Sequence, residues 1–280
     1  MPKKIKNIVV IGAPRSGTTL IGGIISNADK AFPMLPECTY ATQLVRHYYD
    51  ISNYSDPQRY SAYAISEDKL QNIYKTAVSE FISNAHSHFD GMSCEYLVLK
   101  DPELTLLADL IPTFFGDNCK CVCSVRDPRA VISSLIKVFR KKKAARKKLK
   151  EAFNWDSISK AFRIFFDEKQ MLSKVYNYYF ISHTSILYKT GGMHVVQYEK
   201  IVTHDENEFK RLEKYLGYEV NRNGFGKAHF GFDKQDPCYS ESYGKKIQDI
   251  KSDFREMISR RGLKKIQRVF SGFNSIYNWW

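Results

Sequence analysis

Cysteine and acidic residues are scarce in this chain, and long hydrophobic runs are absent from it. Six cysteines in 280 residues are too few for a disulfide scaffold, so we expect the reduced thiols of a cytoplasmic protein. No apolar stretch approaches the roughly 20 residues of a membrane-spanning helix. The start of the chain, up to Ala13, has too short an apolar part for a signal peptide and predicts a strand. Acidic residues number 30 against 43 lysines and arginines, and the formal charge of +13 favours an anionic ligand or partner.

Internal repeats, low-complexity tracts and linkers rich in proline, glycine or serine are also missing, so we expect a single domain over residues 1–280. Short apolar runs predict four buried strands, at Lys6–Ile11, Tyr96–Leu99, Cys119–Val125 and His194–Gln197. Helices are predicted at Thr18–Ser26, from Ser66, from about Arg129, over about Ser157–Tyr188, and from a capping box of Thr203 and Glu206 to Gly217. Strands that alternate with helices predict an α/β fold: a three-layer sandwich around a central, mostly parallel sheet.

Three of the cysteines, Cys119, Cys121 and Cys123, alternate along the third predicted strand. This alternation places the thiols on one face of the strand, where small apolar side chains pack well. A zinc site is the alternative, but such sites are typically built from C-x₂-C pairs, which this spacing lacks. We therefore expect the three thiols in the hydrophobic core and no metal site.

The loop from Gly12 to Thr19 joins the first predicted strand to the first predicted helix. Its glycines allow a tight turn and a close approach of a ligand to the backbone. N–H groups at the start of the helix attract anions, and Arg15, Thr18 and Thr19 add further donors. The loop is similar to the Walker A motif, G-x-x-x-x-G-K-[ST], but Thr18 stands where that motif has the lysine that clamps the β- and γ-phosphates. We predict a P-loop-like oxyanion cradle rather than an ordinary turn.

A second candidate anion site follows the third predicted strand. Arg126 stands at the strand end, and Ser134 lies about two turns into the next helix, which begins near Pro128. An arginine and a helix hydroxyl in these positions can hold one phosphate from two sides. The alternative is a salt-bridged helix start, in which Arg126 pairs with Asp127 or Arg129.

These two motifs, P-R-S-G-T-T and R-D-P-R-A-V-x-x-S, resemble the two phosphate motifs of sulfotransferases. That family transfers a sulfuryl group from 3′-phosphoadenosine 5′-phosphosulfate (PAPS) to a hydroxyl acceptor. The resemblance implies that the phosphate held by Arg126 and Ser134 is the 3′-phosphate of PAPS. A nucleoside triphosphate has no need of such a site. It assigns the 5′-phosphosulfate to the loop residues Ala13, Pro14, Arg15, Ser16, Gly17, Thr18 and Thr19.

Weaker similarities run in pieces from residue 7 to about residue 250. The predicted strand that ends in Tyr198-Glu199 is similar to the family's Y-E strand, whose tyrosine contacts the adenine. The segment around Lys245 is similar to the one that closes over the nucleotide, which assigns Lys245 to the 3′-phosphate region. The plainer alternatives are a core aromatic for Tyr198 and a solvated lysine for Lys245.

The resemblance also implies the catalytic groups. Glu37 has a place like that of the glutamate base in protein-tyrosine and carbohydrate sulfotransferases, and is expected to deprotonate the acceptor hydroxyl. Lys100, in a similar K-D-P string, is expected to stabilise the departing phosphate, with Arg15 adding positive charge. The alternatives are a surface glutamate and an exposed strand end. Cytosolic small-molecule sulfotransferases usually have lysine in place of Arg15, so this chain is nearer the other branch, including the bacterial enzymes. Because arginine and lysine supply the positive charge, no metal is required.

The sequence therefore predicts a PAPS-dependent sulfotransferase whose acceptor is a hydroxyl compound, either a saccharide or another molecule, with an anionic one included. One rival is a P-loop kinase or NTPase, which needs the missing lysine. The other is a non-catalytic protein that binds nucleic acid or another anion through Lys137–Lys150, a run of nine lysines and arginines without an acid. That rival leaves both anion motifs without a purpose, so we expect no nucleic-acid partner. Nothing in the sequence indicates the oligomeric state.

Overall fold

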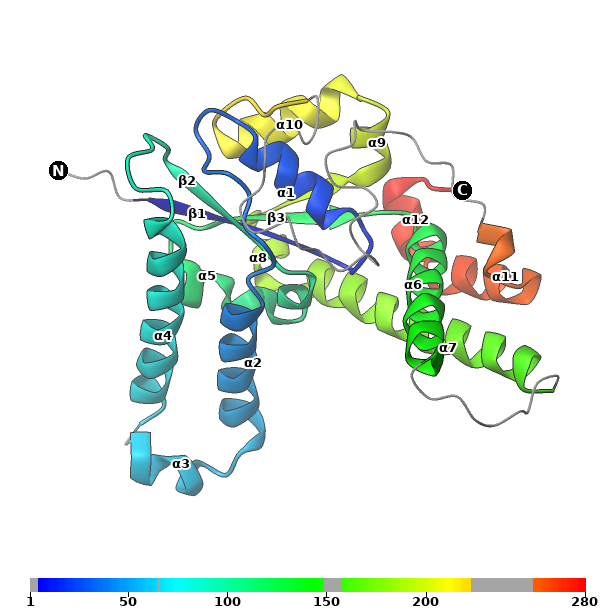
Figure 1. Cartoon of the computed structure of the whole chain (residues 1–280), viewed down its shortest axis with the longest axis horizontal. Coiled ribbons are helices and arrows are strands. Elements are labelled where there is room, and N and C mark those ends of the chain that lie inside the picture. The colour runs from blue at the N-terminus through cyan, green and yellow to red at the C-terminus, as the bar shows by residue number, and fades with distance from the viewer. Residues whose placement is uncertain (1–4, 65, 149–157, 223–253) are drawn as a thin grey trace.

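Four parallel strands form the centre of the protein. The computed structural model describes residues 5–64, 66–148, 158–222 and 254–280. The strands are β1 (Lys6–Gly12), β2 (Tyr96–Lys100), β3 (Lys120–Val125) and β4 (Met193–Gln197), in the sheet order β2-β1-β3-β4 (Figure 1). All four strands predicted from apolar runs are confirmed to within a residue at each end, and the sheet is parallel throughout.

Strands β1, β2 and β3 are buried on both faces, and alternate residues pack against opposite layers; β4, at one end of the strand order, is partly exposed. In β1, Ile8 and Val10 belong to one hydrophobic cluster, whereas Val9 and Ile11 belong to the other. A parallel strand covered on both faces needs apolar side chains in both directions, which explains its continuous apolar run. The sheet is therefore the middle layer of three, as the sequence predicts.

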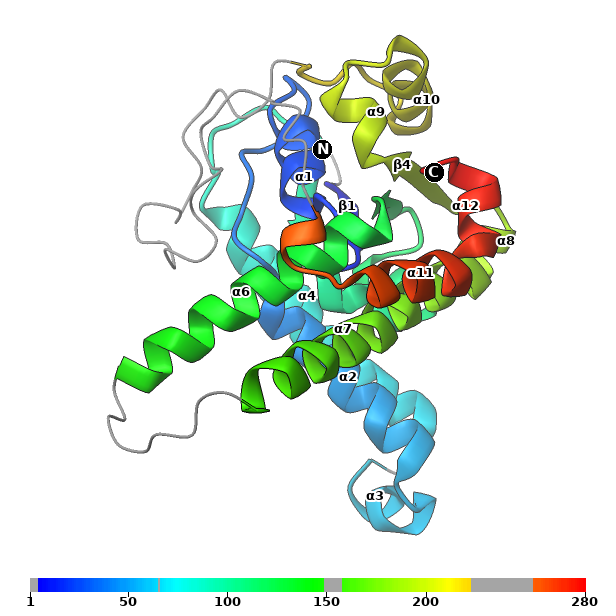
Figure 2. The same cartoon turned by 90° about the vertical axis from the view of Figure 1, so that its right-hand side faces the viewer.

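Helices form the two outer layers. One face of the sheet is covered by α1 (Thr18–Ser26), α9 (Tyr198–Val202) and α10 (Glu206–Leu216). The other face is covered by η1 (Pro102–Leu110), α5 (Ile111–Phe115), α6 (Pro128–Lys148), α7 (Ile158–Thr184), α8 (Ile186–Lys189), η3 (Phe254–Glu256), α11 (Arg260–Val269) and α12 (Ser271–Tyr277). Figure 2 shows α11 alongside α7, so residues near the end of the chain complete this second layer.

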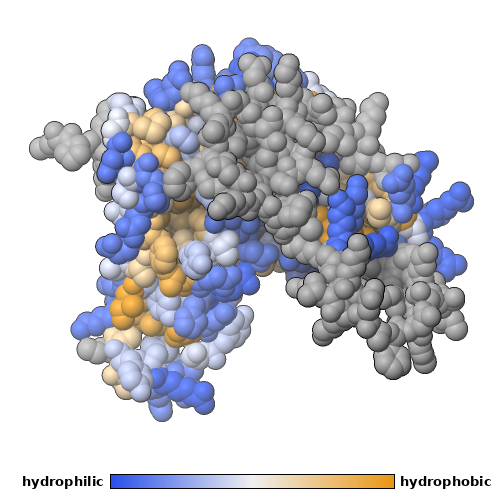
Figure 3. Space-filling model, in the orientation of Figure 1, coloured by the Kyte–Doolittle hydropathy of each residue, from blue (hydrophilic) through white to orange (hydrophobic). Residues whose placement is uncertain are grey.

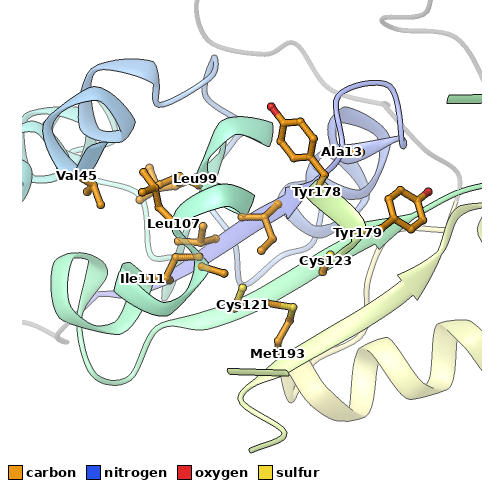
Figure 4. Close-up of a cluster of buried hydrophobic side chains, with 14 of the residues drawn as sticks. Ala13, Val45, Leu99, Leu107, Ile111, Cys121, Cys123, Tyr178, Tyr179 and Met193 are labelled. Carbon is orange, nitrogen blue, oxygen red and sulfur yellow. The ribbon is translucent and has the colours of Figure 1, made fainter. Parts of the chain in front are cut away.

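The alternating cysteines of β3 lie in the core of the second layer. Cys121 and Cys123 are buried there close to Met193, and Cys119 packs at the edge of the same cluster (Figure 4). Burial raises the pKa of the Cys123 thiol to about 12, so that thiol is uncharged at neutral pH. The predicted packing role of the three thiols is confirmed.

A helical arm extends away from the sheet in both views (Figures 1 and 2). It consists of α2 (Thr39–Tyr54), α3 (Pro57–Ala64) and α4 (Glu67–Ser87). As predicted, Ser66 caps α4, because its hydroxyl accepts a hydrogen bond from the N–H of Lys69. Val45 and Val78 are fully buried members of the larger hydrophobic cluster and fix α2 and α4 to the body.

The predicted helix over 157–188 is in fact two helices. α7 ends at Thr184, and the Ser185 hydroxyl accepts a hydrogen bond from the N–H of Tyr188, 3.2 Å away, to begin α8. Serine at this position satisfies a free N–H at a helix start, and the apolar spacing on either side hid the break. Among the helices in the described residues, none is both long and apolar enough to cross a membrane.

The predicted capping box at the start of α10 is wrong. The N–H of Glu208 donates to Oδ1 of Asp205 at 2.9 Å, so Asp205 caps this helix. Thr203 instead donates its hydroxyl hydrogen to the carbonyl oxygen of Glu199, 3.0 Å away, at the end of α9. The short helix α9 was not predicted, and Thr203 lies at its C-terminal end instead of capping α10. Gly217 ends α10 in the left-handed conformation, as predicted.

Candidate active site

The residues singled out from the sequence gather at the carboxyl ends of β1, β2 and β3. From β1 the chain crosses to β2 on one side of the sheet and then to β3 on the other side. The carboxyl ends of β1 and β3 therefore flank the point where the strand order reverses, the usual ligand position in parallel sheets. Gly12 and Ser124 are paired residues at these two strand ends.

Two buried hydroxyls hold the loop after β1. The N–H of Gly12 donates to Oγ1 of Thr105 at 2.8 Å, and the hydroxyl of Ser124 donates to the carbonyl oxygen of Ser16 at 2.8 Å. Gly12 has φ +139°, and a Cβ there would lie 2.4 Å from the carbonyl oxygen of Ser124. This position therefore requires glycine, and the loop shape is set by groups that the sequence analysis did not identify.

The start of α1 faces the ring of Tyr198. Gly17 precedes the helix with φ +101°, and no side chain caps the first turn. A Cβ at Gly17 would lie 2.2 Å from a ring carbon of Tyr198, so the aromatic ring closes directly over the backbone. The helix start thus keeps its positive end beside an aromatic surface, an arrangement suited to a phosphate attached to a flat base.

The two predicted anion motifs are joined through Arg15. Its side-chain Nε donates to the Ser134 hydroxyl at 3.1 Å, and its carbonyl oxygen accepts from Nη1 of Arg126 at 3.2 Å. The guanidinium of Arg126 also lies 4.3 Å from the centre of the Tyr198 ring. Arg15, Arg126, Ser134 and Tyr198, which stand far apart in the sequence, therefore form one cluster.

The turn that carries Arg126 is held from two directions. The N–H of Arg126 donates to the Tyr179 hydroxyl at 3.1 Å, and that hydroxyl donates in turn to the Arg126 carbonyl oxygen. The N–H of Asp127 donates to Oε1 of Glu199 at 2.8 Å. Burial raises the pKa of the Glu199 carboxyl. Glu199 therefore holds the chain just after β3, a role that the Y-E string by itself does not indicate.

Asp127 pairs with Arg129 at 2.6 Å, and this pair extends to the two terminal tryptophans. The Arg129 guanidinium donates to the carbonyl oxygen of Trp279 at 3.0 Å and lies 4.6 Å from the centre of a Trp280 ring. The indole N–H of Trp279 donates to Glu199 at 3.3 Å. The salt-bridged helix start considered as an alternative is present, but Arg129 makes it, and Arg126 contacts the loop instead.

Glu37 and Lys100 meet, although 63 positions separate them in the sequence. The Lys100 ammonium lies 2.8 Å from Oε1 of Glu37 and donates to the Thr19 hydroxyl at 3.1 Å. The side chain of Lys100 is 1% exposed and that of Glu37 is 48% exposed. A hydrogen bond from the N–H of Cys38 to the Lys100 carbonyl oxygen, 3.0 Å long, fixes the returning chain beside β2. The hydrogen bond from Lys100 to Thr19 connects the end of β2 to the start of α1.

The remaining predicted positions are less informative. Ala13 and Ser16 are buried in the loop, and Pro14 is half-buried. Lys245 lies outside the described residues, so its predicted role has no structural counterpart here. The basic run from Lys137 to Lys150 begins on α6, but most of its side chains lie outside the described part of the chain. Within that part, no group of three or more His, Cys, Asp or Glu side chains is arranged to hold a metal ion.

Together, the fold and this cluster define a parallel α/β domain with a cationic, hydroxyl-rich strand–loop–helix at the crossover point of its sheet. The family model described as "Sulfotransferase family" matches residues 7–222, and the chain belongs to that family. A search of curated proteins gave no match.

Solved structures support the same fold. The sulfotransferase domain of the olefin synthase from Synechococcus PCC 7002 is similar over 96% of both chains, with a TM-score of 0.55 and 14% identity. Sulfotransferase STF9 from Mycobacterium avium is similar over 99% of this chain and 77% of its own, with a TM-score of 0.51 and 10% identity. At these identities the likeness establishes the fold, and the chemistry has to be argued from this chain's own residues.

Proposed function

We propose that the protein transfers a sulfuryl group from PAPS to a hydroxyl acceptor. The loop from Ala13 to Thr19, with Arg15, would hold the 5′-phosphosulfate. Arg126 and Ser134 would hold the 3′-phosphate, and the ring of Tyr198 would contact the adenine. Membership of the sulfotransferase family supports the reaction class. The two joined anion motifs support a donor with two separated anionic groups.

The contact of Lys100 with both Glu37 and Thr19 carries the proposal. Thr19 belongs to the loop that would hold the phosphosulfate, so a cation and a carboxylate converge on the place where the sulfur–oxygen bond would break. Both groups are needed in sulfuryl transfer, because an acceptor proton leaves while negative charge grows on the departing phosphate. Neither is needed in a protein that only binds an anion.

The residues divide the chemistry as follows. Glu37 accepts the proton of the acceptor hydroxyl while the acceptor oxygen bonds to sulfur. Its Oε1 is engaged by Lys100, and we assign the acceptor proton to Oε2. Lys100 has three N–H donors, and two point at Glu37 and Thr19. The third is assigned to the bridging oxygen, which takes the electron pair when the bond from sulfur to the phosphate breaks.

The donor assignment is tested by thermal stability with 3′,5′-bisphosphoadenosine, the product nucleotide, against ATP with Mg²⁺. At 100 times its dissociation constant, a ligand of the native state stabilises by about 2.7 kcal/mol. For a chain of this size, that is a rise in Tm of roughly 5–10 °C. The rise is expected with the bisphosphate and is expected to vanish in Arg126→Ala.

Arg59→Ala is the matched control, because Arg59 is an exposed arginine on α3, which lies at the tip of the helical arm away from the sheet (Figure 1). This variant should keep the full shift. A shift with ATP and Mg²⁺ but none with the bisphosphate would refute the proposal and favour a kinase or NTPase instead.

A further inference from the structure

A cavity of about 430 Å³ opens between α2 and α4 of the helical arm. Tyr40, Leu44 and His47 line it from α2, and Phe81 lines it from α4. The three α2 residues are spaced by four and three positions, so they lie on one face of that helix. Figure 3 shows hydrophobic surface gathered over these two helices.

Aromatic side chains form the wall of this cavity. The rings of Tyr40 and Phe81 stack with centres 5.8 Å apart and planes 4° from parallel. Tyr40 is nevertheless 76% exposed and Phe81 is 47% exposed, so neither side chain is needed to fill the core. Exposed apolar surface grouped in a hollow is typical of a binding site rather than of a solvated helix face.

Two of the polar side chains that line the cavity, Arg46 and His47, are engaged within the protein, whereas Gln43 and Asp50 also line it. Arg46 pairs with Glu103 at 3.1 Å, and the His47 ring nitrogen lies 2.7 Å from the Tyr74 hydroxyl. A saccharide would have to displace these two contacts or use Gln43 and Asp50 alone, because it needs several hydrogen bonds to replace its water. An apolar molecule would not, because it needs only the ring faces and Leu44.

Two chain segments lead from the proposed catalytic pair to the cavity. Glu37 lies three residues before Tyr40, and α2 continues from there along the cavity. Glu103, the partner of Arg46, lies three residues after Lys100. Since a helix rises 1.5 Å per residue, the lining residues of α2 from Tyr40 to Asp50 extend over about 15 Å.

We propose that this cavity binds the body of the acceptor, and that the acceptor is an alcohol with an extended apolar chain. The proposal rests on the proposed sulfotransferase function. With the hydroxyl at Glu37, the chain would run along α2 over Tyr40 and Leu44 and against Phe81. Of the two acceptor classes that the sequence leaves open, a saccharide or another hydroxyl compound, this selects the second.

The test is a series of acceptors that share one hydroxyl: ethanol, 1-butanol, 1-hexanol, 1-octanol and 1-decanol, with glucose as the polar comparison. Release of 3′,5′-bisphosphoadenosine from PAPS is measured for each. Each buried methylene is worth up to about 0.8 kcal/mol, so kcat/KM should rise two- to fourfold per methylene until the cavity is filled. Glucose should react no faster than ethanol.

Variants separate the cavity from the catalytic pair. Tyr40→Ala and Phe81→Ala should lower kcat/KM for 1-octanol at least tenfold and leave ethanol within twofold. Tyr40→Phe should retain the wild-type values. Tyr54→Ala is the matched control, because Tyr54 lies on the same helix, is also 76% exposed and is not part of the cavity lining. It should change neither acceptor.

The outcomes distinguish this proposal from the one on which it rests. A flat chain-length series, a preference for glucose, or an equal loss for ethanol and 1-octanol in Tyr40→Ala would overturn the apolar acceptor site and leave the sulfotransferase assignment standing. Bisphosphate binding without turnover of any alcohol would overturn it too. Absence of bisphosphate binding would instead refute the proposed function itself.

Discussion

Lys100 and Lys120 lie at opposite ends of the sheet, on different strands. Replacing Lys100 by methionine should lower the rate and leave stability nearly unchanged, whereas replacing Lys120 should lower stability and leave the rate nearly unchanged. Lys100 ends β2 with its ammonium buried beside Glu37. Lys120 begins β3 and donates to the carbonyl oxygens of Tyr215 and Leu216, 2.8 and 2.6 Å away, at the end of α10. The first lysine is assigned to chemistry and the second to structure.

Lys100→Met should abolish most of the rate while leaving the fold intact. Methionine fills a similar volume and removes the cost of burying an ammonium, whereas Glu37, 48% exposed, can regain water. We therefore expect the free energy of unfolding to change by no more than about 1 kcal/mol, or a few degrees in Tm. Loss of one donor to the departing oxygen should lower kcat by about 10²–10³.

Lys120→Met should lower the stability of the fold and leave most of the rate intact. Two carbonyl oxygens at the end of α10 lose a charged donor, and such bonds contribute about 1.5–3 kcal/mol each when well shielded. Because Lys120 is only half-buried, about 2 kcal/mol in total is expected, which lowers Tm by roughly 4–8 °C. The rate at saturating substrate should stay within twofold. Thermal melts and initial rates of both variants decide the matter: a Lys100→Met protein with more than a tenth of the wild-type kcat would refute the assigned role.

Four further outcomes are expected. Glu37→Gln should lower kcat by about 10²–10⁴ with unchanged bisphosphate affinity, since an amide cannot take the acceptor proton; calorimetry and initial rates measure the two quantities. Gly17→Ala should eliminate the bisphosphate-induced thermal shift, because its Cβ would lie 2.2 Å from the Tyr198 ring. Trp280→Ala removes a cation–π contact with Arg129 of about 1 kcal/mol, so Tm should fall by roughly 2–4 °C in thermal melts. Burial lowers the pKa of His194 to about 4, so the unfolded chain binds more protons below about pH 6.5; stability should fall between about pH 6.5 and 4, and chemical denaturation of His194→Gln should show a weaker fall.

The architecture and the meeting of distant motifs could be predicted from local patterns. Buried parallel strands give continuous apolar runs, and their carboxyl ends share one edge of the sheet. That rule brings the residues after β1, β2 and β3 together, and the resemblance to sulfotransferase motifs singles out Arg15, Lys100 and Arg126 among them. Their proposed roles, like the single domain and the cytoplasmic location, stay predictions.

The supports of the site could not be predicted, because each is a single contact between distant segments. Thr105 and Ser124 are ordinary residues of apolar segments, and nothing local marks their hydroxyls as partners of the loop. Asp205 displaced Thr203 as a helix cap because the unforeseen helix α9 ends between them. The docking of Trp280 on Arg129 depends on how α12 folds back over the sheet.

The link from Arg15 to both Ser134 and Arg126 has a consequence for how such a protein diverges. A substitution at one strand end disturbs the other, because the same loop residue contacts both. The residues of the site that follow the strand ends are therefore expected to be inherited together. The helical arm contacts the body at another place, through Arg46 and Glu103 at 3.1 Å, so its residues can vary separately. Under the proposed assignment, descendants would keep one donor while exchanging one acceptor for another.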